Sequence, residues 1–156
     1  MSLGYEEILD GTPTPRQAPG ARHELICDRL HAAVAASLAG NTTARLLSRR
    51  TQIVLAAGNS LRPDLAVLAA ATGRLWLAAE IVHAGDHHPD TVIKKTIYDT
   101  LRIPRLWMID PRYDNVEVYH GSPYGLVLKG ILAGREQLTE SLLPALRLTI
   151  AELFGP

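Results

Sequence analysis

The chain has 156 residues, enough for one domain with a substantial buried core, and its 47% apolar and 21% charged composition is ordinary for a soluble globular protein. No apolar run approaches the roughly 20 residues needed to cross a bilayer, and the acidic first eleven residues lack the features of a secretion signal, so we expect no membrane association. Sixteen basic and sixteen acidic side chains balance, so net charge gives none of the support that a basic excess would give for nucleic-acid binding.

The first quarter of the chain predicts a strand, a loop and a helix. Residues 5–11 indicate a short strand ending in an Asp-Gly turn, and three prolines within residues 12–20 predict a loop. Residues 21–38 place apolar side chains at helical spacing and end before a glycine, as expected of an amphipathic helix. Cys27, the only cysteine, lies on this helix; it excludes an intrachain disulfide and fits a cytoplasmic location.

Residues 42–50 match no single element, but they form the most basic segment of the chain. Arg45, Arg49 and Arg50 lie within six residues of one another. Two interpretations stay open for them: a solvated surface, or contact with the phosphate groups of a nucleic acid.

The remaining residues alternate short apolar runs with turn signals, apart from two further helices. The predicted strands are residues 52–57, 64–68, 75–82, 105–110, 115–120 and 124–130. Residues 58–60 predict a turn, and residues 89–101 and 148–154 predict helices. This order predicts a mixed α/β fold in a single domain over residues 1–156.

Two of the predicted strands each carry a carboxylate within an apolar run, Asp64 and Glu80. A carboxylate among β-forming residues is costly to desolvate unless it is exposed, paired or bound to a metal. One explanation is a shared Mg²⁺ or Mn²⁺, since these ions prefer oxygen ligands, with the backbone carbonyl of Ile81 as a further ligand. Lys94, on the next predicted helix, would then assist a metal-bound water or the phosphate. A buried acid pair with a purely structural role remains an alternative.

Four further residues are candidates for shaping the same cleft. His23 and Glu24 fall in the first turn of the helix that begins near residue 21, although a solvated histidine and a favourable helix-dipole interaction would explain them equally. Tyr98 follows Lys94 by one helical turn, so the two share a face, and Asp90 lies near the start of their helix. The loop over residues 83–88 holds three histidines, but their spacing matches no common zinc motif.

The chain also carries an ordered set of short motifs: EEILDG, RHELICDRL with His23, RPDLAVL, AEIV, D-x-x-x-K-x-x-x-Y, IPRLWMIDP, VEVYH and LPALRLTIAELF. This set resembles the Uma-two family of restriction endonuclease-like proteins, within the PD-(D/E)XK nuclease superfamily. The resemblance implies a restriction-endonuclease-like core, with a mixed central β-sheet flanked by helices and with metal at Asp64 and Glu80. In the superfamily pattern the lysine follows the glutamate by two residues, and here that position is Val82. The resemblance implies that this family instead carries its lysine on the next helix, where it matches Lys94.

We therefore expect a metal-dependent endonuclease that hydrolyses phosphodiester bonds in DNA, with Asp64, Glu80 and Lys94 as its catalytic residues. The alternative is an inactive nuclease-fold module that binds nucleic acid or a partner protein, which the balanced charge favours. A homodimer is compatible with the first function, because duplex cleavage needs two active sites and the hairpin near Val116 offers an edge. Arg102 departs from the family pattern and either adds positive charge beside the cleft or only alters a surface.

Overall fold

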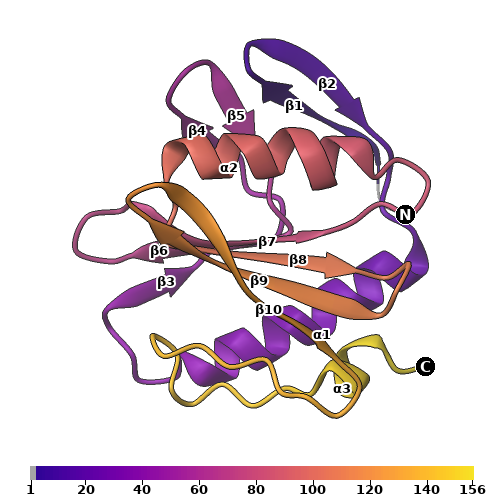
Figure 1. Ribbon diagram of the computed structural model, residues 1–156, viewed down its shortest axis with the longest axis vertical. Helices are drawn as coiled ribbons and strands as arrows, with labels where there is room; N and C mark the ends of the chain where they lie inside the picture. The colour runs from indigo at the N-terminus through magenta and orange to yellow at the C-terminus, as the bar shows by residue number, and fades with distance from the viewer. Residues whose placement is uncertain (1–2) are drawn as a thin grey trace.

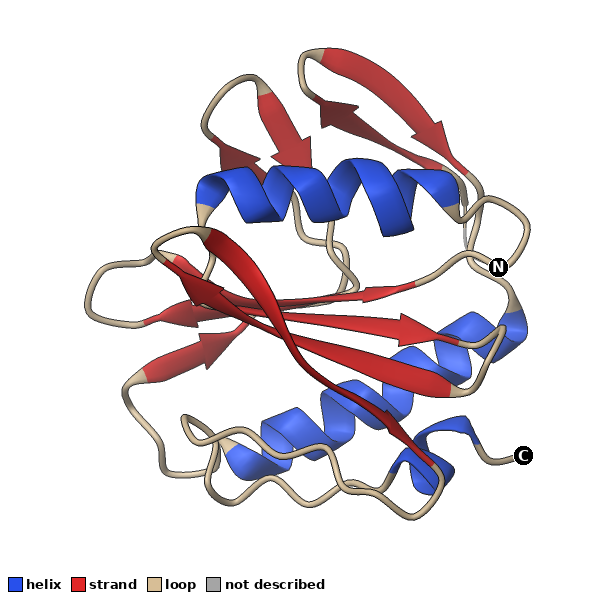
Figure 2. Cartoon of the chain, in the orientation of Figure 1, coloured by secondary structure: helices blue, strands red, loops and turns tan. Residues whose placement is uncertain are grey.

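A six-stranded mixed sheet forms the centre of the computed structural model, which describes residues 3–156 (Figures 1 and 2). Its spatial order is β10-β9-β8-β7-β6-β3. The strands are β3 (Ala44–Leu46), β6 (Leu65–Ala69), β7 (Leu75–Ile81), β8 (Arg105–Asp110), β9 (Asn115–Ser122) and β10 (Gly125–Ala133). Strands β7 and β8 are parallel and the other neighbours antiparallel, which confirms the predicted mixed sheet.

Helices cover both faces of this sheet (Figure 1). Helices α1 (Ala21–Ser37) and α3 (Ile150–Phe154) lie on one face; the π-helical segment η1 (Pro89–Lys94) and helix α2 (Lys95–Leu101) lie on the other. Over residues 77–82 successive residues alternate between the two layers, so Ala79 packs in the core beneath α1 whereas Ala78 and Val82 pack beside α2. An irregularity in the β6–β7 register interrupts this alternation at Trp76, which packs in the same core as Leu77.

A second sheet, which the sequence analysis did not predict, lies beyond α2 in the order β2-β1-β5-β4. Its strands are β1 (Tyr5–Leu9), β2 (Thr12–Arg16), β4 (Ile53–Leu55) and β5 (Asn59–Leu61). The loop predicted for residues 12–20 and the turn predicted for residues 58–60 are therefore partly wrong. Prolines 13 and 15 are tolerated because β2 is an edge strand, where a missing N–H removes no ladder hydrogen bond on the open side.

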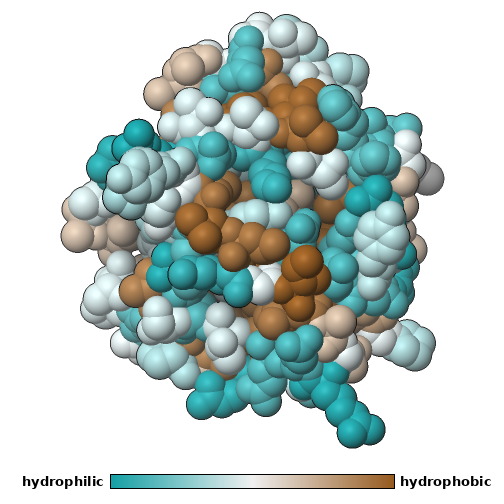
Figure 3. Space-filling view, in the orientation of Figure 1, coloured by the Kyte–Doolittle hydropathy of each residue, from teal (hydrophilic) through white to brown (hydrophobic). Residues whose placement is uncertain are grey.

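The predicted dimer edge near Val116 is wrong. Strand β9 pairs with β8 on one side and with β10 on the other, and Val116 is fully buried. In the larger sheet the outer strands are β3 and β10. Figure 3 shows apolar side chains in small groups over the middle of the face that β10 crosses.

Within residues 3–156, no helix combines the length and apolar character that a membrane span requires. A homodimer and a cytoplasmic location stay predictions.

Candidate functional site

Asp64 and Glu80 lie opposite each other across the β6–β7 pair. Leu65 pairs with Ala79 in the antiparallel register, so Asp64, one residue before β6, stands opposite Glu80. Directly opposed residues of antiparallel strands project from the same face of a sheet, which here is the face that α2 covers. Each of the two residues is only 2% exposed, so both carboxylates are held away from solvent.

Lys94 and Tyr98 reach Glu80 from the helical layer above the sheet. The Nζ atom of Lys94 lies 2.7 Å from the Glu80 carboxylate, and the Tyr98 hydroxyl donates to its Oε2 atom at 2.6 Å. Both side chains are buried and are separated by one helical turn. The structure therefore brings these two residues to Glu80, on the sheet face that also carries Asp64.

Glu7 of β1 joins this cluster, although the sequence analysis gave it no role. Its carboxylate accepts hydrogen bonds from Lys94 Nζ at 2.7 Å, from Arg16 Nη1 at 2.6 Å and from the backbone N–H of Arg62 at 2.7 Å. Arg16 in turn donates to Asp90 at 2.8 Å. Glu7 shares the inward face of β1 with Tyr5 and Leu9, so the signal that identified Glu80, a carboxylate on an apolar strand face, would also have identified Glu7.

Asp64 is surrounded by hydrogen-bond donors. Its Oδ1 atom lies 3.1 Å from His23 Nε2 and accepts from Arg50 Nη1 at 3.0 Å, while Oδ2 accepts from the backbone N–H of Ile81 at 2.8 Å. Arg50 also donates to both carboxylate oxygens of Glu24, at 2.6 and 2.7 Å. His23 and Glu24 thus lie beside Asp64; their role in shaping the site and the Ile81 carbonyl as a metal ligand stay predictions.

The basic segment does not form one surface. Arg49 donates to Asp28 at 2.5 Å and Arg50 is engaged with Glu24 and Asp64, so both guanidinium groups are already paired with carboxylates. Arg45 lies apart from them on β3 and is exposed. Their role as phosphate contacts stays a prediction.

The cluster holds more negative than positive charge. Five carboxylates and three cationic side chains contribute to it: Glu7, Glu24, Asp64, Glu80 and Asp90, against Arg16, Arg50 and Lys94. When all are ionised, two negative charges remain, before any charge on the histidine rings is counted. Burial, assisted by neighbouring carboxylates, raises the pKa of Glu80 to about 8. Burial also disfavours the Asp64 anion, but its bonds with His23 and the Ile81 N–H prevail and lower its pKa to about 2.

This donor set fits a divalent cation of the magnesium type. Mg²⁺ is commonly bound through one or two carboxylates and completed by water and substrate phosphates, and the excess of carboxylates over cationic groups in the cluster favours a cation. His83 Nε2 is buried without a hydrogen-bond partner among residues 3–156, and its ring centroid lies 4.7 Å from that of His23. No group of three or more His, Cys, Asp or Glu side chains in this range is arranged to hold a metal ion by itself.

The site is closed rather than open to solvent. None of the four residues Asp64, Glu80, Asp90 and Lys94 exceeds 2% exposure, and His23 and His83 are 8% exposed. The cleft that these residues were expected to shape is covered, because the smaller sheet places Glu7 and Arg16 against the cluster. Access of a substrate to these carboxylates requires that the smaller sheet or the charged side chains move.

The raised pKa of Glu80 predicts that the metal-free protein loses stability above neutral pH. Between pH 4.5, where an ordinary glutamic acid ionises, and about 8, the folded state retains a proton that the unfolded state has released, so the free energy of unfolding falls as pH rises. Burial lowers the pKa of His83 from 6.5. This shift makes the free energy of unfolding rise with pH, but only up to about pH 6.5. We expect the melting temperature in EDTA to fall between about pH 7 and about pH 8.5, and Glu80→Gln to flatten this dependence. A rise over that range in the wild type would contradict the assignment.

The mixed sheet with helices on both faces and the buried acid–lysine cluster define a nuclease-like fold. The protein belongs to the Uma2 family, described as "Putative restriction endonuclease", whose profile matches residues 4–151. The fold is similar to the crystal structure of a "putative nuclease belonging to DUF820" from Anabaena variabilis ATCC 29413, with a TM-score of 0.79 and 16% sequence identity over 96% of this chain and 89% of that chain. A comparison with curated proteins found no match.

Proposed function

We propose that this protein is a divalent-metal-dependent endonuclease that hydrolyses phosphodiester bonds in DNA. One observation carries the proposal: Asp64, Glu80 and Lys94 come from three separate elements and are buried in one cluster on the α2 face of the larger sheet. The description of the Uma2 family and the likeness to a nuclease structure support the same class of reaction.

The side chains have distinct roles in this proposal. Asp64 and Glu80 hold Mg²⁺ or Mn²⁺, which when bound polarises the phosphate and lowers the pKa of a bound water. Glu80 and Glu7 raise the pKa of Lys94 despite its burial, so its ammonium stays protonated. Lys94 is therefore suited to stabilise negative charge on the phosphate and unsuited to act as the general base. Tyr98 orients the Glu80 carboxylate through its hydroxyl.

The second candidate is an inactive nuclease-fold module that binds nucleic acid or a partner protein. The observation that favours it is the closure of the site. Both Glu80 oxygens and both Asp64 oxygens already accept hydrogen bonds within the protein, and a complete buried network can persist for structural reasons alone.

Titration with Mn²⁺ separates the two candidates. The catalytic proposal expects the wild type to bind Mn²⁺ by calorimetry and to nick supercoiled plasmid in Mn²⁺ but not in EDTA. Glu80→Gln should lose both properties, because it removes an oxygen anion from the proposed ligand set. Glu136→Gln is the matched control, since Glu136 is exposed in a loop and, among residues 3–156, its carboxylate accepts only from the nearby Ala133 N–H. Absence of Mn²⁺ binding at millimolar concentration in folded wild-type protein would favour the inactive module.

A further inference from the structure

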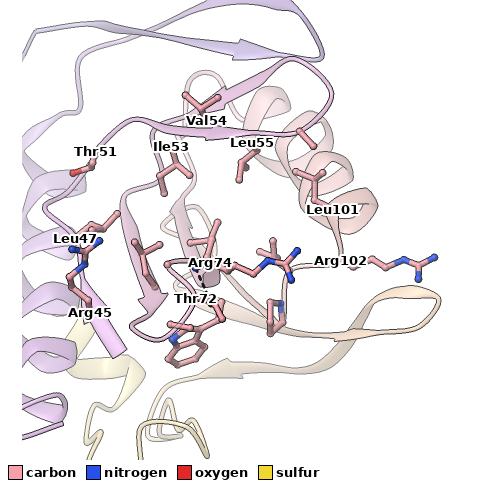
Figure 4. Close-up of a pocket in the computed structure, with 18 of the residues that line it drawn as sticks. Arg45, Leu47, Thr51, Ile53, Val54, Leu55, Thr72, Arg74, Leu101 and Arg102 are labelled. Atoms are coloured by element: carbon pink, nitrogen blue, oxygen red, sulfur yellow. Dashed lines mark hydrogen bonds between the residues drawn. The ribbon is translucent and has the colours of Figure 1, made fainter. Parts of the chain in front are cut away.

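A groove of about 990 Å³ opens at the end of β6 and β7 that is remote from Asp64 and Glu80 (Figure 4). It is bordered by β3, β4, the β6–β7 turn and the end of α2. Its lining includes three arginines, Arg45, Arg74 and Arg102, and no aspartate or glutamate. Figure 4 shows these three side chains spread along one side of the groove, across from the apolar side chains of β4.

These arginines differ from most others in the chain because their charge is uncompensated. Of the thirteen arginines, six are paired with carboxylates within residues 3–156, namely Arg16, Arg22, Arg49, Arg50, Arg105 and Arg112. Arg45, Arg74 and Arg102 donate no side-chain hydrogen bond to any described residue, and all three are exposed. Arg102 also adopts a left-handed backbone, φ 55°, at the C-cap of α2, where glycine would be favoured. The groove therefore presents three free guanidinium groups.

The groove and the acidic cluster share one face of the larger sheet. Arg45 pairs in register with Leu68, and Leu68 with Leu75, so their side chains lie on one face. Asp64 precedes Leu68 by four residues, an even separation that places it on that same face. At roughly 3.3 Å per residue the two positions are about 13 Å apart, a distance that a few consecutive nucleotides of one DNA strand span.

We propose that this groove binds the phosphate backbone of duplex DNA, a few nucleotides from a phosphate held at the acidic cluster. The inference rests on the proposed function and extends it to residues outside the reacting centre. Charge complementarity carries it, since guanidinium forks match phosphate geometry and three of them line a groove without a carboxylate. The hydroxyl group of Thr72, which accepts from the Arg74 N–H and also lines the groove, is a further donor of the kind that contacts phosphate.

The test compares two triple variants of equal charge change. In the groove variant, Gln replaces Arg45, Arg74 and Arg102 together. In the control variant, Gln replaces the exposed Lys129, Arg135 and Arg147. Binding of a fluorescent 20-base-pair duplex (about two helical turns) is followed by anisotropy over a salt series, in EDTA and with Ca²⁺. The groove variant should bind at least about tenfold more weakly, and its log–log salt slope should shrink by about 0.9 for each phosphate that it no longer neutralises, up to about 2.7. The control should retain wild-type affinity and slope.

The outcomes separate this inference from the proposed catalysis. If the wild type never nicks plasmid but the groove variant alone binds more weakly, the groove assignment stands and the catalytic proposal fails. If the wild type nicks plasmid and both triple variants bind alike, the groove assignment is overturned and the catalytic proposal stands. A wild type that binds no duplex in either buffer overturns the groove assignment as well. Circular dichroism melting checks that both variants are folded.

Discussion

Replacement of Asp64 by Asn is expected to lower the rate of Mn²⁺-dependent plasmid nicking by about three orders of magnitude. The metal's stabilisation of the transition state is worth several kcal/mol, and each 1.4 kcal/mol or so changes a rate tenfold. Asn keeps the size of the side chain and one oxygen acceptor for the Ile81 N–H, but it removes the anion that a hard cation prefers. The measurement is the initial nicking rate at saturating Mn²⁺.

The control for this exchange is Asp28→Asn. Asp28 also lies beside the basic segment and pairs with Arg49, but its side chain is 62% exposed and contacts none of the cluster. We expect wild-type nicking from that variant. Mn²⁺ titrations of both variants distinguish loss of the metal from a change in the chemical step, and nicking by Asp64→Asn at the wild-type rate would show that the metal is not held there.

The sequence allowed prediction of the features that depend on local patterns. Apolar runs bounded by turn residues identified the strands β6 to β10 of the larger sheet but not β3, and helical spacing identified α1 and the η1–α2 segment. The positions of Asp64 and Glu80 within such runs made them candidates before any contact was known. Lys94 and Tyr98 followed from the helical period, because a spacing of four residues fixes a shared face whatever the rest of the fold does.

The features that were missed depend on contacts between distant segments. Arg16 and Asp90 are 74 residues apart, and their pairing at 2.8 Å depends on the smaller sheet, which brings β2 to the start of η1. The prolines of β2 masked that strand, because an edge position that tolerates proline cannot be recognised until the order of strands is known. Nor does the sequence show that Arg45 lies with Arg74 and Arg102, since they come from three different elements.

Replacement of Glu7 by Ala is expected to have the largest effect on stability, about 3–5 kcal/mol, which is typical when one partner of a buried ion pair is removed. For a chain of this length that loss corresponds to a melting temperature lower by about 6–20 °C. Glu7 is 1% exposed and accepts hydrogen bonds from Lys94, Arg16 and the Arg62 N–H. Its removal leaves both cationic groups buried with one anionic partner fewer, and no water replaces that carboxylate without entering the core.

The neighbouring residue supplies the control, because Glu6→Ala removes the same side chain from the exposed face of β1. We expect that variant to melt close to the wild type. The double variant Glu7→Ala/Lys94→Met should be less destabilised than the sum of the two single changes, since each single change leaves a buried charge that the other removes; coupling of this kind is commonly about 0.5–3 kcal/mol. Equal melting temperatures of the Glu6 and Glu7 variants would mean that the Glu7 carboxylate does not hold the smaller sheet on the cluster. The closed site would then open without breaking the ion pairs that Glu7 makes with Lys94 and Arg16.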